Sequence, residues 1–224
     1  EDRPGQINAA LTQITREIAF VFSRKLLNPQ FVAEHRQVTQ RVLATLPDEA
    51  STKRTDSSGY LALIGQNWKL PPLLTPDEER SLFVTLNSLR YQANAQRSQL
   101  NPRRPARARI TELERLLSEA DAVRQHLVDA NVRLVISLAS RMSDALLSFD
   151  DLFSEGLLIL LKTIDGFDFS KGFRFSTYAT NSLQRHFFRL RKRTLRKRQF
   201  GTPIDDDVLR TASNGSTGDQ LTPD

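Results

Sequence analysis

The chain has 224 residues, of which 39% are hydrophobic and 26% charged, so it is too apolar for wholesale disorder and long enough for one large domain or two small ones. It contains no cysteine, which excludes disulfides, thiolate metal sites and cysteine nucleophiles, and its apolar runs are far too short to span a bilayer. We therefore expect a cytoplasmic protein without a signal peptide. Its net charge of +6 makes a polyanion a plausible partner.

Helical periodicity dominates the chain and predicts an all-α protein with about seven helices. Apolar residues at spacings of three and four predict an amphipathic helix over residues 7–27 and a second helix over 29–46. The polar stretch 47–59 is typical of a linker, and a short helix is expected over 60–68. Residues 1–58 thus form an N-terminal helical segment with a linker, whose role stays open between autoinhibition, partner binding and a scaffold.

A capping signal marks the next helix. Thr75 can cap a helix that begins at Pro76, and Glu78 completes a capping box, so we expect this helix to continue to about Ser98. A basic break over residues 101–109, with two prolines, separates it from the helix that follows.

An unusually long helical pattern covers residues 110–142, and a bend is expected near 129–131. Ser148 and Asp151 then form a second N-terminal signature, which opens a helix over roughly 149–165.

A loop over residues 166–175 leads to the last predicted helix. Ser176 is its cap candidate, and the helix is expected to reach about Arg198. Residues 201–224 are rich in Gly, Ser, Thr, Asp and Pro, which predicts a disordered tail or the start of a truncated linker.

The sequence offers little for catalysis. His35, His126 and His186 lie far apart in sequence, and no glycine loop of the phosphate-binding type is present. We therefore expect a protein that is not an enzyme and has no cofactor.

Asp150, Asp151 and Glu155 form the one carboxylate constellation. A metal site would need further ligands and is disfavoured. The positive end of a helix explains Asp150 and Asp151 alone. A docking face for a basic partner helix explains all three, because Asp151 and Glu155 lie four residues apart on one helix face.

Aromatic and cationic residues alternate around the predicted loop. The aromatic residues are Phe167, Phe169, Phe173, Phe175 and Tyr178, interleaved with Lys171 and Arg174. We expect about two of the five rings in the core, Phe167 first among them, because burying all five would draw the cations inward. The exposed rings are then a candidate platform for single-stranded bases.

The helix behind this loop is strongly basic. Its cations are Arg185, Arg189, Arg191, Lys192, Arg193, Arg196, Lys197 and Arg198, around an apolar stripe of Leu183, Phe187 and Leu190. Such a density of one charge favours contact with a duplex phosphate backbone over a merely solvated face.

Two stretches of the sequence carry a family resemblance. Residues 130–142 (ANVRLVISLASRM) and 149–180 (FDDLFSEGLLILLKTIDGFDFSKGFRFSTYAT) resemble region 2 of the sigma-70 family of bacterial transcription initiation factors. Residues 59–83 (GYLALIGQNWKLPPLLTPDEERSLF) are similar to region 1.2 of that family. The resemblance implies a multi-helix bundle with a region 1.2-like part over 59–100 and a region 2-like domain over 101–200.

The resemblance also implies roles for individual residues. Family members bind core RNA polymerase, direct it to promoters and capture the non-template strand of the melted −10 element. The residues implied in the single-strand pocket and its approach are Phe167, Asp168, Lys171, Phe173, Arg174, Phe175, Thr177, Tyr178, Asn131 and Arg133, with Tyr178 as the stacking platform. Those implied at the duplex edge and backbone are Asn181, Ser182, Arg185, Arg189 and Lys192. Those implied to face the clamp coiled coil of the largest polymerase subunit are Asp150, Asp151, Ser154, Glu155 and Leu158.

The sequence departs from the family pattern in three places. Asn181 and Ser182 stand where housekeeping members carry a tryptophan pair that acts as a wedge, so weaker spontaneous melting is expected. Arg185 replaces a glutamine that reads a base pair, and arginine favours guanine, so a changed promoter preference is expected. Nothing after Gly201 resembles the helix-turn-helix that reads the −35 element. Either the sequence is truncated, or the protein relies on something else for its upstream contact.

Two functions remain open at this stage. The first is a sigma factor that binds core RNA polymerase and promoter DNA, with an anti-sigma factor as a further possible partner. The second is a regulatory decoy that binds polymerase but does not open promoters, which the missing tryptophans favour. The retained aromatic cluster favours the sigma factor, because a decoy has no need of a base pocket.

Overall fold

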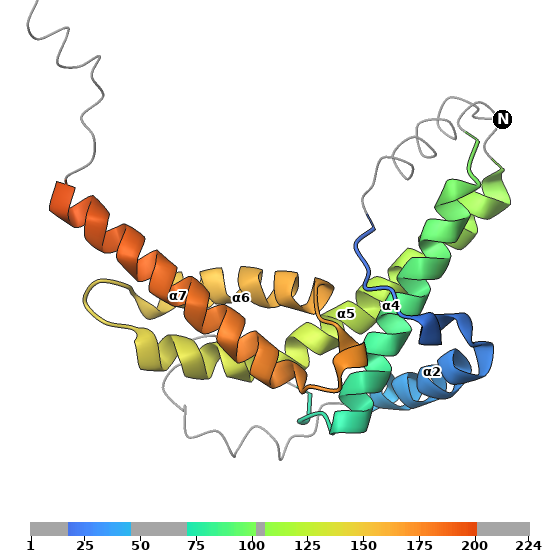
Figure 1. Cartoon of the computed structure of the whole chain (residues 1–224), viewed down its shortest axis with the longest axis horizontal. Helices are drawn as coiled ribbons and strands as arrows, with labels where there is room; N and C mark the ends of the chain where they lie inside the picture. The colour runs from blue at the N-terminus through green and yellow to red at the C-terminus, as the bar shows by residue number, and fades with distance from the viewer. Residues whose placement is uncertain (1–17, 46–70, 102–105, 201–224) are drawn as a thin grey trace, which may run out of the picture.

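The computed structural model describes residues 18–45, 71–101 and 106–200, and this part of the chain is all-α, as the sequence predicts (Figure 1). Its helices are η1 (Arg24–Leu27), α2 (Pro29–Ala44), α4 (Pro76–Ser98), α5 (Arg107–Met142), α6 (Phe149–Asp165), η3 (Phe169–Lys171) and α7 (Phe175–Phe200). None of the described helices is both long enough and apolar enough to cross a membrane. The predicted linker, the short helix over 60–68 and the C-terminal tail lie outside the described residues.

α4 is the central helix of the fold. Its N-terminus has the predicted capping box: the Thr75 hydroxyl accepts from the Glu78 backbone N–H, and the Glu78 carboxylate accepts from the Thr75 N–H. Every residue from 81 to 90 is buried, because α2 packs on one side of α4 and α5 on the other (Figure 1). Several buried polar residues on this helix are paired; Thr85, for example, shares a hydrogen bond of 2.8 Å with Thr39 of α2.

The segment before η1 corrects the sequence prediction. The periodicity predicts a helix over residues 7–27, but residues 18–23 are not helical. Their backbone is bound by side chains of α4: Asn87 accepts from the Val21 N–H, and Arg90 donates to the Ala19 carbonyl. Phe20 and Phe22 both contact the ring of Tyr91, which an extended chain permits and a helix does not, because residues i and i+2 share a face only when extended. The part of the predicted helix before residue 18 lies outside the described residues.

α5 and α6 form the body on which α7 rests. α5 begins three residues before the predicted start and passes through residues 129–131 without interruption. α6 has the predicted bounds, and Ser148 caps it by accepting from the Asp151 N–H. Gly156 lets α6 approach its neighbours: a Cβ at this position would lie 2.5 Å from Cγ1 of Val135 in α5 and 3.2 Å from Cζ of Phe187 in α7.

α7 begins at Phe175, so Ser176 lies inside the helix and is not its cap. The first N–H of the helix, that of Phe175, donates instead to Oε1 of Glu79 at 2.9 Å. A carboxylate is favourable at the positive end of a helix, so a residue of α4 stabilises the start of α7. The predicted stripe of Leu183, Phe187 and Leu190 is buried.

A cluster of two ion pairs around one carboxylate joins α4, α5 and α6. Asp165 forms ion pairs with Arg90 at 2.9 Å and with Arg124 at 2.7 Å. Burial alone would raise the pKa of Asp165, but the hydrogen bonds from Arg124 and the nearby Arg90 hold it below its usual value. The cluster therefore keeps its charges at neutral pH and ties the three helices together.

Candidate nucleic-acid interface

The five aromatic residues around the loop before α7 divide into buried and exposed rings. Phe167, Phe169 and Phe175 are 5%, 4% and 0% exposed, whereas Phe173 is 72% and Tyr178 43% exposed. Three rings are therefore in the core, one more than expected. The two remaining rings are available to a ligand.

The buried rings form a support for Tyr178. Phe83 of α4 contacts Phe167 and Phe175 at centroid distances of 4.7 and 5.1 Å. Phe167 in turn lies 5.6 Å from the ring of Tyr178. The expectation that Phe175 lines the pocket is wrong, because its side chain is fully buried and acts only as part of this support. Phe167 likewise lies behind the exposed ring.

Arg174 has a partner within the protein. Its guanidinium donates to the Glu79 carboxylate, with the Nε–Oε1 distance at 3.2 Å, and the Glu79 side chain is only 8% exposed. Glu79 thus holds both Arg174 and the first N–H of α7. Arg174 therefore holds the loop against α4, and this role is additional to any contact with a ligand.

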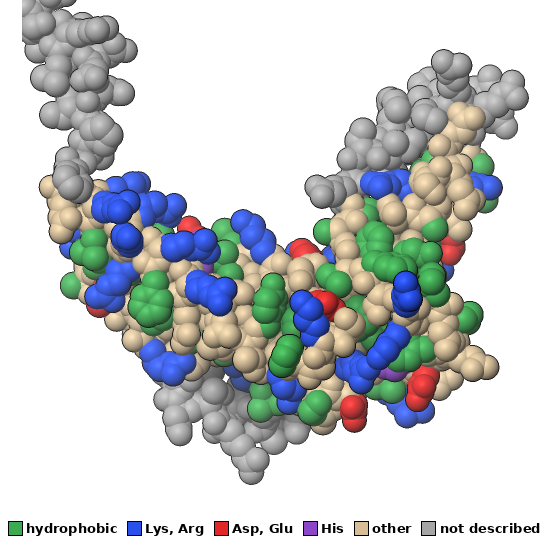
Figure 2. Space-filling view, in the orientation of Figure 1, with side chains coloured by type: hydrophobic (Ala, Val, Ile, Leu, Met, Phe, Trp, Pro, Cys, Tyr) green, Lys and Arg blue, Asp and Glu red, His purple; other side chains and the backbone are tan. Residues whose placement is uncertain are grey.

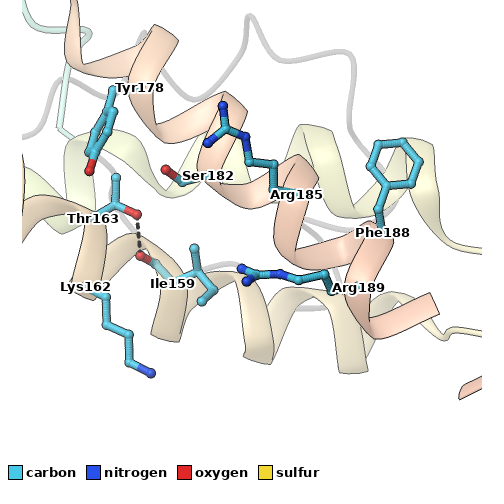
Figure 3. A pocket seen from close by; sticks show the side chains of 8 residues that line it. All are labelled: Ile159, Lys162, Thr163, Tyr178, Ser182, Arg185, Phe188 and Arg189. Carbon is cyan, nitrogen blue, oxygen red and sulfur yellow. Dashed lines mark hydrogen bonds between the residues drawn. The ribbon is translucent and has the colours of Figure 1, made fainter. Parts of the chain in front are cut away.

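The exposed aromatic residues line two separate hollows. Phe173, Phe169 and Arg174 line a hollow of about 140 Å³ against the start of α4, which contributes Asp77 and Arg80. A larger open groove of about 630 Å³ lies between α6 and α7, and its lining residues are Ile159, Lys162, Thr163, Tyr178, Ser182, Arg185, Phe188 and Arg189 (Figure 3). Phe173 and Tyr178 line different members of this pair of hollows, whereas the sequence predicts one pocket for both.

The loop residues next to these rings form their own contacts. Asp168 caps η3 by accepting from the Ser170 N–H, and it forms an ion pair with Lys171 at 3.7 Å. The hydrogen bonds from Ser170 and the charge of Lys171 lower the pKa of Asp168, so it is ionised at neutral pH. Lys171 and Thr177 are both exposed.

Asn131 and Arg133 of α5 are half-buried and lie in neither hollow. The Asn131 amide donates to the Leu127 carbonyl, and the Arg133 guanidinium donates to the Pro71 carbonyl at 2.6 Å. Burial lowers the pKa of Arg133, although not enough to remove its charge at neutral pH. Both side chains thus bind the protein itself in this structure.

The residues predicted at the duplex edge all lie on the surface of α7. Ser182, Arg185 and Arg189 line the groove, whereas Asn181 and Lys192 are exposed outside it. Figure 2 shows Lys and Arg side chains gathered over the C-terminal part of α7. This surface can bind phosphates over several helical turns.

The predicted polymerase-binding face lies on α6. Asp150, Asp151 and Ser154 are exposed, and Leu158 is 54% exposed. Two of the carboxylates also have local roles: the Ser148 hydroxyl donates to Asp151, and Glu155 pairs with His186 of α7 at 2.8 Å. Asp151 therefore stabilises the N-terminus of α6, as one of the explanations from the sequence has it. Glu155 has a partner in α7 that the sequence did not predict.

The comparisons with known proteins concern the same segment of the chain, which carries α6 and α7. The family model of sigma-70 region 2 matches residues 127–198, which cover the C-terminal part of α5, all of α6 and nearly all of α7. This segment is thus similar to sigma-70 region 2. The family resemblance seen in the sequence is thereby confirmed for this part of the chain.

Two curated relatives extend this finding. The chain is 34% identical over 122 residues to the RNA polymerase principal sigma factor HrdC of Streptomyces coelicolor, which is 54% of this chain and 35% of that protein. It is 51% identical over 61 residues to the RNA polymerase sigma factor SigA of Lactococcus lactis, which is 27% of this chain and 16% of that protein. The chain thus spans about a third or less of the length of these relatives.

Sequence reasoning missed three residues of the candidate interface. Glu79 was unrecognised because its partners lie 95 and 96 residues away in sequence. Lys162 was missed because it lies on α6, apart from the basic helix. Phe188 could have been found, since at 3.6 residues per turn it lies off the stripe of Leu183, Phe187 and Leu190 and so faces away from the core.

Proposed function

We propose that this chain is a sigma factor that acts in transcription initiation in the bacterial cytoplasm. It would bind core RNA polymerase and capture non-template bases of the −10 element. One observation carries the proposal: in a segment that matches sigma-70 region 2, the exposed ring of Tyr178 rests on a buried aromatic support.

The geometry of the interface supports each step. Stacking of a base on an aromatic ring contributes roughly 1–3 kcal/mol, and the buried ring of Phe167 holds Tyr178 in place for it. Phe173 offers a second exposed ring at the neighbouring hollow. The cations of α7 would neutralise phosphates of the upstream duplex. Arg185 would favour a guanine at the duplex edge, because arginine binds the O6 and N7 atoms of guanine with two hydrogen bonds.

The acidic face of α6 would dock on the clamp coiled coil of the largest polymerase subunit, a basic partner helix. Asp150, Asp151 and Leu158 are the exposed residues on which this proposal rests. We also propose that residues 59–100 form the region 1.2-like part of the chain and that residues 101–200 form the region 2-like domain.

A further proposed partner is an anti-sigma factor, which would cover the same face of α6.

A decoy is the second candidate function. Such a protein would bind polymerase through α6 without opening promoters. Asn181 and Ser182 favour it, because both side chains are small where a wedge of two tryptophans was expected from the family.

Binding of a fluorescent single-stranded −10 oligonucleotide, measured by anisotropy with and without core RNA polymerase, separates the two. For a sigma factor we expect polymerase-dependent binding that weakens roughly tenfold in Tyr178→Ala, within the range that stacking of one base contributes, and is kept in Tyr178→Phe. A chain that binds polymerase but ignores the oligonucleotide is the decoy. A chain that binds neither is not a sigma factor.

A further inference from the structure

The groove between α6 and α7 contains an aromatic side chain that the proposed function does not use. Phe188 is 62% exposed and lines this groove, whereas its neighbour Phe187 is fully buried (Figure 3). Phe187 supplies the core contact of this helical turn, so the fold does not need an aromatic ring at position 188. Because this ring lines a groove together with several polar side chains, it is a candidate for ligand contact.

The charges around Phe188 fit a nucleic acid. Three of the eight lining residues are cationic, namely Lys162, Arg185 and Arg189, and none is acidic. Lys162 lines the groove from α6, whereas the two arginines line it from α7 (Figure 3). A groove with cations on both walls and an exposed ring binds a phosphate backbone and a base at once.

The position of Phe188 on α7 separates it from Tyr178. The two residues are ten positions apart, which is about 15 Å along the helix at 1.5 Å per residue. One base cannot touch both rings. A strand that places an unstacked base on Tyr178 therefore meets Phe188 at a different nucleotide, towards the basic end of the helix.

We propose that Phe188 is a second base-contacting residue, which packs against the outermost base pair at the upstream edge of the melted DNA. Arg189, the next residue on α7, binds a phosphate beside it, and Arg185 contacts the edge of the pair. Apolar side chains of DNA-binding proteins frequently insert between base steps and partially unstack them. Since Asn181 and Ser182 are small, Phe188 supplies the aromatic surface on this part of α7. The inference rests on the proposed function and adds a residue to it.

The test uses the full chain bound to core RNA polymerase and two probes. One is the single-stranded −10 oligonucleotide, and the other is a fork junction with an upstream duplex and a single-stranded non-template extension. Phe188→Ala should weaken binding of the fork about tenfold, the effect expected when one ring no longer stacks on a base, and leave the single strand unaffected. Tyr178→Ala should weaken both. Phe188→Trp should bind the fork as the wild type does, because it keeps a ring.

Leu195→Ala is the matched control, since Leu195 is 42% exposed on the same helix but does not line the groove. Fork binding unchanged in Phe188→Ala, while Tyr178→Ala still lowers it, would overturn the inference and leave the proposed function intact. Weaker association of Phe188→Ala with polymerase in the absence of DNA would overturn it in favour of a protein contact. A wild-type chain that binds neither probe would remove the proposed function itself.

Discussion

The two halves of α7 meet the rest of the molecule in different ways. In the first half, Phe175, Ala179, Leu183 and Phe187 are fully buried against the body of the protein. After Leu190 the described side chains are exposed, except for a half-buried threonine. Contacts of this second half are polar: an ion pair of 2.6 Å between Arg191 and Asp144, and a hydrogen bond from Arg198 to a backbone carbonyl. The first half can therefore fix a ring in position, whereas the second half supplies charge that needs no fixed position.

Truncation of an anchoring ring should have the largest effect on stability. Phe175→Ala removes a fully buried side chain, so we expect the free energy of unfolding to fall by about 3–5 kcal/mol. Phe188→Ala makes the same chemical change on the exposed side of the same helix and should alter stability by less than about 0.5 kcal/mol. Denaturant unfolding of both variants measures the difference. If both variants lost the same free energy of unfolding, the buried side of α7 would not anchor the helix more firmly than its exposed side.

Steric crowding beneath the first half of α7 should have the next largest effect on stability. Gly156→Ala places a Cβ 2.5 Å from Val135 and 3.2 Å from Phe187, so we expect the free energy of unfolding to fall by about 1–3 kcal/mol despite the better helix propensity of alanine. At Gly166 the nearest atom to a new Cβ is 3.5 Å away, an ordinary contact, which makes Gly166→Ala the control. A Gly156→Ala variant as stable as Gly166→Ala would show that α7 rests less closely on α6 than described.

The polar anchor of α7 should contribute less. Glu79→Gln removes the charge that pairs with Arg174 and accepts from the Phe175 N–H, so we expect the free energy of unfolding to fall by about 1–2 kcal/mol. Asp77→Asn, an exposed change in the same turn of α4, is the control and should cost about 0.5 kcal/mol or less. Thermal unfolding compares the two, and a decrease in the control as large as in Glu79→Gln would argue against a specific anchor.

Removing charge from the second half should leave stability almost unchanged. Replacement of Arg193, Arg196 and Lys197 by Gln affects only exposed side chains, so we expect a change within about 0.5 kcal/mol. Binding of duplex promoter DNA should instead become less salt-dependent, with the slope of log K against log salt smaller by about 0.9 for each phosphate that the variant no longer neutralises.

Titrations at several salt concentrations measure this slope. The control removes the same charge elsewhere, by replacing the exposed residues Arg24, Lys25 and Arg41 with Gln. If both triple variants change the slope equally, net charge alone governs binding, and the second half of α7 has no special role.

Local signals in the sequence were reliable. The capping box at Thr75 and the cap at Ser148 each depend on side chains and backbone groups three residues apart, so the sequence alone predicts them. The bounds of α6 and the buried stripe of α7 follow from the same short-range periodicity.

Long-range contacts explain what the sequence could not predict. Residues 18–23 have a helical pattern but are not helical, because Asn87 and Arg90 of α4 bind their backbone. The sequence predicts too late a start for α7, because the cap comes from Glu79 rather than from Ser176. In the candidate site, charges among the rings correctly indicated that some rings are exposed, but which of them depends on packing against Phe83, a residue of another helix.

The bond between Glu79 and the first N–H of α7 also has a consequence for the newly made chain. The two residues are 96 positions apart, so Glu79 is synthesised about 5–20 s before its partner at ordinary translation rates. During that interval α2 and α4 can already dock on one another, whereas the Glu79 carboxylate still lacks its partner in α7. The loop that carries Phe173 is therefore closed among the last parts of the described fold, and a nascent chain cannot present its aromatic surface before the helices beneath it are complete.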